Sequence, residues 1–437
     1  MSIHTRPALP RETTSDGAAV TGVRADAPDG GIRVDLPTVL REPVAADRPR
    51  WGSRRRRVLV VHSSDEMYGS DRVVVEVVGE LAARDDLDVT VWLPSDVAPG
   101  PLAPLLRDLG ARVERVPLPV LRRRRLRGAG PLGLARDAAR TRRRLAAARP
   151  DLVWCATSAC LVLAPLARSV GVPSVVAHLQ ETWTDGDRRG LAPLVRSATA
   201  VVAVSRAVLG TADLADDPRA VVVPNGVPAG APPVAPPSDG PVRWVVASRW
   251  NPHKGHATLL AAWDAAGCPG ELVVLGGPPA AGTGVDVPGL VETVVSRPET
   301  VTVVGEVDDA TPWLRGAHAV LLPTDSLEGF GLVAIEAFRE GRAVVASRSG
   351  GPEEVVEHAV TGWLFERGDV EGLARLLAGL DRDELTAAGR RAAAVQRERF
   401  TPERLRRGVV AVVEHELDLG RDAVRRPRRV VYRAVAR

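Results

Sequence analysis

The chain has 437 residues, of which 45% are hydrophobic and 26% are charged. This length is too great for one ordinary hydrophobic core and predicts two domains, and the composition excludes a collagen-like or wholly disordered protein. Lys and Arg number 58 against 54 Asp and Glu, a balance that selects no partner by itself.

The cysteines and the apolar segments constrain the compartment. Cys155, Cys160 and Cys268 are too few and too irregularly spaced for a disulfide framework or a four-ligand zinc site. The N-terminal residues lack the apolar core of a signal peptide, and no window approaches the roughly 20 apolar residues that a membrane-spanning helix requires. We therefore expect a reduced, cytoplasmic protein that does not itself cross a membrane.

The first half of the chain alternates between two kinds of segment. Residues 1–52 mix Pro, Gly, Asp and Arg without apolar periodicity and predict a disordered leader. Short β-branched runs then alternate with helical segments over 53–227, which predicts βαβ units and a Rossmann-like domain with a parallel sheet. Strands are expected at 57–64, 88–94, 111–119, 151–157, 174–180, 198–205 and 220–227.

A second domain of the same class follows a linker. Residues 228–240 are rich in Pro, Ala and Gly and predict a semi-extended linker. Strand and helix patterns resume over 241–405, and 406–437 holds a helix with an apolar stripe followed by a basic tail. Strands are expected at 242–249, 271–277, 300–307, 319–324, 343–347 and 362–366. Because ligands of open α/β sheets bind beyond the carboxyl ends of the strands, we expect a ligand-binding cleft between the domains.

The segment EGFGLVAIE, from Glu328 to Glu336, has the features of a ligand loop. It follows a predicted strand, and a helix is predicted from about Leu332 to Arg339. Its glycines, Gly329 and Gly331, remove side chains where backbone must approach a ligand closely. The helix start offers a phosphate its positive dipole end and the amides of Phe330, Gly331 and Leu332.

The two glutamates of this segment suit hydroxyl groups. Glu336 lies about one turn into the helix, where its carboxylate can accept hydrogen bonds from vicinal hydroxyls such as those of a ribose. Glu328, in the loop, can reach a different group of hydroxyls. Two glutamates eight residues apart are commonplace, however, and a solvated surface pair is the alternative interpretation.

The order of the motifs is more specific than any one of them. MYGSDRVV contains Gly69, VVAHLQETW places His178 after a strand, and VSRAV and VVPNGV end the first domain. ASRWNPHKGH supplies Arg249 and Lys254, and EGFGLVAIE, SGGPEEVV and TGWLF follow in that order. Over residues 57–400 this order resembles the GT-B fold glycosyltransferases, in particular glycosyltransferase family 4, the glycosyl transferases group 1.

The resemblance implies a fold, an activity and roles for residues. It implies an N-terminal acceptor-side domain facing a C-terminal nucleotide-sugar-binding domain across a cleft, and sugar transfer to a hydroxyl acceptor with retention of configuration. Glu336 would contact the ribose, Glu328 the donor sugar, and Val304 would lie by the base. His178 would lie near the donor sugar and the reacting centre. Gly69 would approach the reacting sugar or the acceptor, with helix entry as the alternative interpretation.

Arg249 and Lys254 are the candidates for charge stabilisation. Breaking a glycosyl–phosphate bond leaves a nucleoside diphosphate whose oxygens gain negative charge in the transition state, so fixed cations lower the barrier. Two cations and a helix start would neutralise the diphosphate without a metal, and no cofactor is expected. The acidic pair Asp308 and Asp309 is expected to cap a helix rather than to hold a metal.

The Arg-rich runs of the sequence allow two interpretations of the binding partners. Residues 54–57, 122–127 and 421–437 are rich in Arg. They are interpreted either as solvated faces or as a peripheral docking surface for an anionic inner membrane leaflet. Nucleic acid is not expected, because no recognised binding motif accompanies the charge. The expected partners are a nucleotide-sugar and a carbohydrate or lipid-linked acceptor, as in polysaccharide biosynthesis.

Three other functions fit the same fold. One is a non-catalytic nucleotide-sugar-binding protein, which would be expected to lose the cations or the glutamates that this chain keeps. The others are a nucleotide-sugar epimerase and a glycoside phosphorylase, and the chain has no signature for the lysine-bound pyridoxal phosphate that a phosphorylase usually needs. Fold alone does not decide among them.

Overall fold

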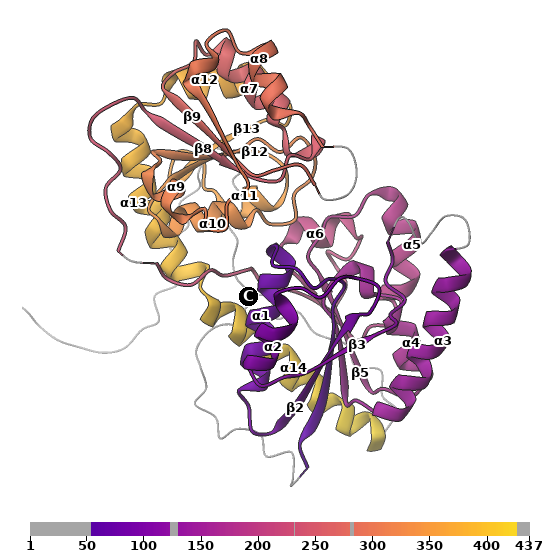
Figure 1. Cartoon of the computed structure of the whole chain (residues 1–437). Coiled ribbons are helices and arrows are strands. Elements are labelled where there is room, and N and C mark those ends of the chain that lie inside the picture. Colours follow the sequence, from indigo (N-terminus) through magenta and orange to yellow (C-terminus); the bar gives the residue numbers. More distant parts are fainter. Residues whose placement is uncertain (1–53, 123–129, 231, 280–283, 426–437) are drawn as a thin grey trace, which may run out of the picture. The chain divides into compact units, whose positions relative to one another are not determined.

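The computed structural model describes residues 54–122, 130–230, 232–279 and 284–425 (Figure 1). The predicted leader 1–52, residues 123–127 of the basic run and the tail beyond Arg425 lie outside the described residues.

The first domain is built on a parallel sheet of seven strands. Its order is β3-β2-β1-β4-β5-β6-β7, with Val58 of β1 paired to Val89 on one side and Leu152 on the other. The strands are β1 (Arg56–Val61), β2 (Leu87–Pro94), β3 (Arg112–Val116), β4 (Leu152–Cys155), β5 (Ser174–Leu179), β6 (Ala200–Ala203) and β7 (Ala220–Val222). The helices are α1 (Gly69–Ala82), α2 (Leu102–Asp108), α3 (Gly130–Ala148), η3 (Ser158–Cys160), α4 (Leu163–Ser169), α5 (Asp185–Val195) and α6 (Arg206–Thr211).

The second domain repeats this plan with six parallel strands in the order β10-β9-β8-β11-β12-β13. The strands are β8 (Arg243–Ala247), β9 (Glu271–Leu275), β10 (Val301–Gly305), β11 (Ala319–Leu322), β12 (Ala343–Ser347) and β13 (Gly362–Phe365). The helices are η4 (Pro252–Lys254), α7 (His256–Ala265), α8 (Val287–Val294), η5 (Pro298–Thr300), α9 (Thr311–Gly316), α10 (Leu332–Arg339), α11 (Gly351–Val355), α12 (Val370–Gly379), α13 (Arg382–Arg399) and α14 (Pro402–Arg425). The predicted doubly wound class is therefore confirmed.

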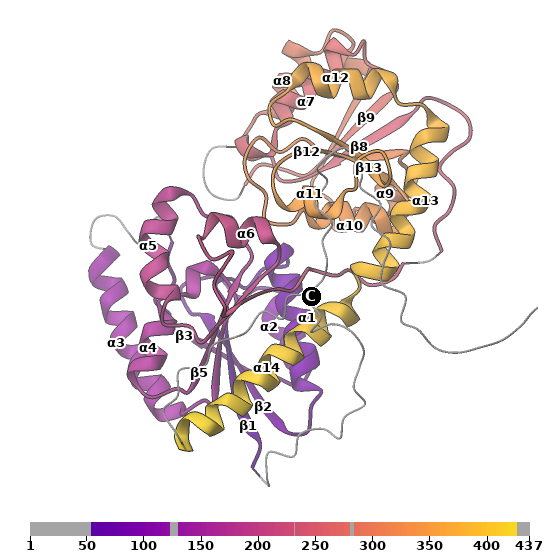
Figure 2. The ribbon, with the colours of Figure 1, turned by 180° about the vertical axis from the view of Figure 1, so that it is seen from behind.

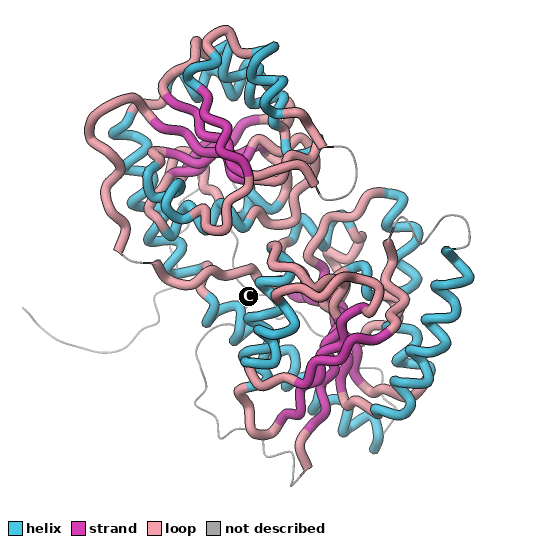
Figure 3. The backbone as a smooth tube through the Cα atoms, viewed as in Figure 1, coloured by secondary structure: helices cyan, strands magenta, loops and turns pink. Residues whose placement is uncertain are grey.

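Both faces of each sheet are covered by helices, as Figure 3 shows. Alternate residues of a strand point to opposite faces, so Val58 and Val60 join one core cluster while Leu59 and Val61 join the other. Because both faces are buried, the central strands are nearly continuous apolar runs, which is why the sequence pattern predicted them.

The last helix returns to the first domain. Leu405, Val409, Val413 and Leu417 recur every four residues along α14 and pack in the core cluster that contains Val58 and Val60 (Figure 2). Arg84, two residues after the end of α1, donates to Glu414 of α14 at 2.5 Å. The predicted C-terminal segment 406–437 thus contains a helix as expected, but the helix begins at Pro402 and completes the first domain's core.

The predicted linker has no regular helix or strand in its described residues, 228–230 and 232–240. It is held to the second domain by hydrogen bonds to its carbonyls. Arg342, which is 1% exposed, donates to the carbonyl of Val234, and Arg382 donates to that of Pro237. These contacts anchor the linker's second half.

Candidate active site

The predicted donor residues gather where the strand order of the second sheet reverses. β8 and β11 are neighbours, Arg249 and Lys254 follow β8, and Glu328 follows β11. Open α/β sheets bind ligands at such a switch point, because the chain leaves neighbouring strands in opposite directions there. Lys254 Nζ lies 2.5 Å from Glu328 Oε2, and the two side chains are 24% and 22% exposed.

The glycine after Lys254 brings these two loops together. Gly255 has φ of 74°, and a Cβ there would lie 1.7 Å from the Pro323 carbonyl oxygen at the end of β11. The Asp325 amide also donates to the His253 carbonyl at 2.9 Å. The Lys-Gly pair therefore has a steric reason: only glycine lets the loop after β8 rest on the loop after β11.

The pKa of His253 is shifted by the charged groups around it. Burial lowers its pKa most, the cation of Lys254 lowers it further, the carboxylate of Glu328 raises it, and Arg249 lowers it again. The three predicted charged groups are thus all close enough to act on one imidazole. His253 was not among the predicted site residues, although its place directly before Lys254 was a usable signal.

The glycines of the EGFG loop allow close backbone packing. Gly331 has φ of 83° and is the N-cap of α10. A Cβ on Gly351 would lie 2.4 Å from the Gly329 carbonyl oxygen, and the Gly351 amide donates to the Glu328 carbonyl at 2.9 Å. The SGGPEE stretch therefore lies directly on the EGFG loop, which explains why both glycine-rich motifs occur together.

The start of α10 lies where it was predicted, and the side chains of Phe330 and Leu332 beside it make different contacts. α10 begins at Leu332 with no side-chain cap on its first amides. Phe330 is 5% exposed and stacks edge to face against Phe400 with ring centroids 5.9 Å apart, so only its backbone can serve a ligand. Leu332 touches the other end of the site, because a Cβ on Gly69 would lie 2.9 Å from Leu332 Cδ1.

Two predicted donor residues contact the start of α1. Arg72 Nη1 donates to Glu336 Oε1 at 2.9 Å, with the Glu336 side chain 16% exposed. The Arg249 guanidinium carbon lies 4.3 Å from the centroid of the Tyr68 ring. Tyr68 and Arg72 were not among the predicted site residues, and their only signal in the sequence was their position beside Gly69.

The VSRAV motif also reaches this region. Ser205 Oγ donates to the Gly329 carbonyl at 2.6 Å. The carboxylate of Glu354, in the GGPEE stretch, accepts from the amides of Arg206 and Ala207 at 3.0 and 2.8 Å. These contacts explain the VSRAV motif: its serine hydroxyl donates to the Gly329 carbonyl, and the first amides of α6 donate to the Glu354 carboxylate.

His178 lies in the strand expected at 174–180. It belongs to β5, is 0% exposed, and packs edge to face on Trp154 with ring centroids 5.4 Å apart. It faces the core because it shares the strand face of Val176, which packs in the first domain's core. Burial, with the nearby charge of His62, lowers its pKa to about 3, so the imidazole is neutral at physiological pH. Neither ring nitrogen has a hydrogen-bond partner among the described residues.

The two remaining predictions concern the base and a metal. Val304 is the fourth residue of β10 and is half-buried. Asp309 accepts from the Thr311 amide at 2.9 Å, so it serves the start of α9 from one position before the N-cap, Ala310. The described residues contain no group of three or more His, Cys, Asp or Glu side chains suited to a metal ion. No helix among them combines the length and apolar composition needed to span a bilayer.

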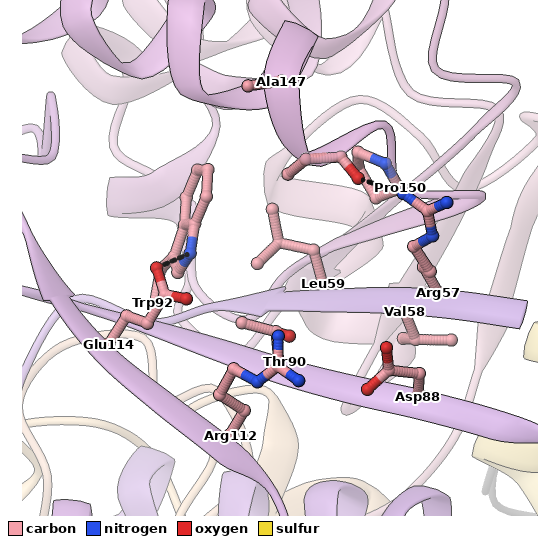
Figure 4. Close-up of a pocket in the computed structure, with 11 residues that line it drawn as sticks. Arg57, Val58, Leu59, Asp88, Thr90, Trp92, Arg112, Glu114, Ala147 and Pro150 are labelled. Atoms are coloured by element: carbon pink, nitrogen blue, oxygen red, sulfur yellow. Dashed lines mark hydrogen bonds between the residues drawn. The ribbon is translucent and has the colours of Figure 1, made fainter.

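A cavity of about 420 Å³ lies elsewhere, on the first sheet (Figure 4). Its walls come from β1, β2 and β3 and from the end of α3, and they include Arg57, Thr90, Trp92 and Glu114. Trp92 Nε1 donates to Glu114 at 3.2 Å across one wall. None of the residues that line this cavity belongs to the candidate site.

Two family models match the chain. Residues 67–230 match Glycosyltransferase Family 4 and residues 241–383 match Glycosyl transferases group 1. An alpha-1,3/1,6-mannosyltransferase of Neurospora crassa is 33% identical over 105 residues, 23% of this chain and 22% of that protein. An N-acetyl-alpha-D-glucosaminyl L-malate synthase of Bacillus anthracis is 36% identical over 86 residues, 20% of this chain and 22% of that protein. The chain thus matches under a quarter of the length of these curated relatives.

The similarity of fold extends further. The crystal structure of Anabaena HepE in complex with UDP-glucose is similar with a TM-score of 0.68 and 21% identity, covering 82% of this chain and 99% of that one. The two family models fall on the two described domains and meet at the linker. The chain belongs to the GT-B fold glycosyltransferases of the family 4 type.

Proposed function

We propose that this chain transfers a sugar from a nucleotide-sugar to a hydroxyl acceptor with retention of anomeric configuration. The observation that carries the proposal is the contact of Lys254 with Glu328 at the switch point of the second sheet, with Arg249 on the same loop after β8. Cations at this position suit a departing diphosphate, and the uncapped start of α10 adds a positive dipole end.

The remaining donor contacts follow from the same geometry. The diphosphate would lie by Arg249, Lys254 and the amides at the start of α10, and Glu336 would accept hydrogen bonds from the ribose. Glu328 would hold hydroxyls of the donor sugar, and the base would lie near Val304. The similar Anabaena HepE structure is a complex with UDP-glucose, which supports a nucleotide-sugar as the ligand.

His178 and Gly69 would serve the reacting end of the donor. Gly69 adjoins Leu332 at the first turn of α10, so the α1 start lies beside the proposed phosphate position. The proposed role of His178 rests on the family resemblance, because its ring is fully buried and its two nitrogens have no partner among the described residues. Retention and independence of metal are the chemistry that the family resemblance and the two cations support.

The acceptor is proposed to be lipid-linked or a polysaccharide, handled by the first domain at a membrane surface. α3 supports this proposal. Arg136, Arg140, Arg143 and Arg144 are exposed at helical spacing, and Leu132 beside them is 77% exposed. A basic stripe ending in an exposed leucine suits an anionic lipid headgroup region.

The test is ligand-induced stabilisation of the purified full chain. UDP-, GDP- and ADP-sugars are screened for a raised thermal midpoint, since a ligand at 100 times its Kd stabilises the native state by about 2.7 kcal/mol. We expect one base to stabilise the protein strongly, and Arg249→Met to abolish the shift. No shift with any nucleotide-sugar would refute the proposal. Binding without release of nucleoside diphosphate in the presence of any acceptor tested would favour the non-catalytic alternative.

A further inference from the structure

A buried carboxylate holds the loop before α1 in place through hydrogen bonds. Asp71 is 1% exposed and accepts from His62 Nε2 at 2.7 Å, from Ser64 Oγ at 2.6 Å and from the Tyr68 amide at 2.9 Å. Burial alone would raise the pKa of this carboxyl, but the hydrogen bond and charge of His62, with the other two donors, lower it overall. The backbone at Tyr68 is therefore held by an ionised anchor.

The side chain of Tyr68 contacts a cation of the second domain. It is 37% exposed, and the Arg249 guanidinium carbon lies 4.3 Å from the centre of its ring. Within the described ranges Arg249 makes no ion pair, whereas Lys254 is paired with Glu328. Of the two proposed diphosphate cations, Arg249 is thus the one whose charge is not already balanced by a carboxylate.

An aromatic face is a suitable support for such a cation. It attracts the guanidinium through its quadrupole and leaves the net positive charge in place, which a carboxylate partner would not. The N–H groups at the edge of the guanidinium plane stay available for bidentate hydrogen bonds to phosphate oxygens. Holding the side chain in advance also reduces the rotamer entropy that binding would otherwise cost.

We propose that Tyr68 is a positioning residue for the donor site: its ring holds the Arg249 guanidinium in place to receive the diphosphate of the nucleotide-sugar. This inference rests on the proposed function and assigns a role to a first-domain residue through a second-domain cation. A cation–π contact of this kind corresponds to about a 2- to 30-fold difference in affinity.

The test is a double-mutant cycle on the full chain, read by calorimetric titration with UDP, or with GDP or ADP if the wild type prefers one of those. The variants are Tyr68→Phe, Tyr68→Leu, Arg249→Met and the Leu/Met double variant. Val294→Ala, which truncates an exposed side chain on α8, serves as a control, and each thermal midpoint is compared with that of the wild type. Leucine keeps an apolar contact but removes the ring, and phenylalanine keeps the ring.

We expect Tyr68→Phe and Val294→Ala to bind within about twofold of the wild type, and Tyr68→Leu to bind about 2- to 30-fold more weakly at an unchanged thermal midpoint. Tyr68→Leu should have no further effect once Arg249 is methionine. The inference is overturned if Tyr68→Leu binds like the wild type, if its loss is the same in both backgrounds, or if Tyr68→Phe loses as much. A wild type that binds none of the three diphosphates would overturn the proposed function as well, and binding that is insensitive to Arg249→Met would remove Arg249 from the site.

Discussion

Replacing Lys254 with alanine tests the centre of the candidate site most directly. Lys254 is the last residue of η4 and contacts Glu328, 74 residues further along the chain, with an Nζ to Oε2 distance of 2.5 Å. The substitution removes a cation from the proposed diphosphate position. It also leaves the Glu328 carboxylate without its partner, so a repulsion of the diphosphate is added to the lost attraction.

The size of the effect on stability follows from the exposure of the pair. Exposed ion pairs contribute up to about 1 kcal/mol, whereas removing one partner of a buried pair costs about 3 to 5 kcal/mol. Both side chains here are about one quarter exposed, so Lys254→Ala should lower the free energy of unfolding by about 2 kcal/mol. The variant should therefore remain folded at room temperature.

The effect on sugar transfer should be larger. Losing one group that stabilises developing charge costs about 100- to 1,000-fold in rate, and we expect a loss of at least about tenfold in kcat/KM. The assay follows nucleoside diphosphate released from the donor that the stabilisation screen identifies. Lys254→Arg should retain part of the activity, and Arg297→Ala, which removes an exposed pair with Glu299, should retain all of it. Unchanged turnover in a folded Lys254→Ala variant would remove Lys254 from the site.

Two further predictions concern the first domain. Burial lowers the pKa of His178 from 6.5 to about 3 in the folded protein. As the pH falls below about 6.5, His178 is therefore protonated in the unfolded chain but not in the folded one, which favours unfolding. This histidine alone should lower the free energy of unfolding by up to about 1.4 kcal/mol per pH unit below that point. His178→Leu should flatten that slope in denaturant titrations from pH 7 to pH 4, and an unaltered slope would contradict the buried neutral imidazole. Replacing Arg136, Arg140, Arg143 and Arg144 of α3 with Gln should weaken binding to vesicles rich in phosphatidylserine in a salt-sensitive manner. Equal binding of both forms at low salt would argue against the membrane surface.

Local patterns predicted α10 well. Its limits, Leu332–Arg339, coincide with the expected ones because a glycine with positive φ, Gly331, precedes it and a helical apolar pattern follows. The Lys-Gly and Gly-Gly motifs could also be recognised in the sequence, because their glycines occupy positions where any other residue would clash with a neighbouring loop. Such features depend on residues that are close together in the chain.

Contacts between distant residues could not be predicted in this way. Arg72 and Glu336 are 264 positions apart, and nothing in either segment indicates that they meet. The surroundings of His178 could not be predicted either, because a histidine near a strand end has the same sequence pattern whether it faces a ligand or the core. Its ring packs on Trp154 of β4, a contact between two strands that no local pattern around His178 indicates.

The sequence by itself determined two parallel α/β domains, their family and the charged residues that follow the strands of the second sheet, because periodicity, glycines and motif order are local properties. The tertiary structure decided which of those residues meet: Lys254 with Glu328, Arg249 with Tyr68, and α14 with the first sheet. These pairings depend on strand order and on side-chain packing across the fold, and neither is written in any one segment of the chain.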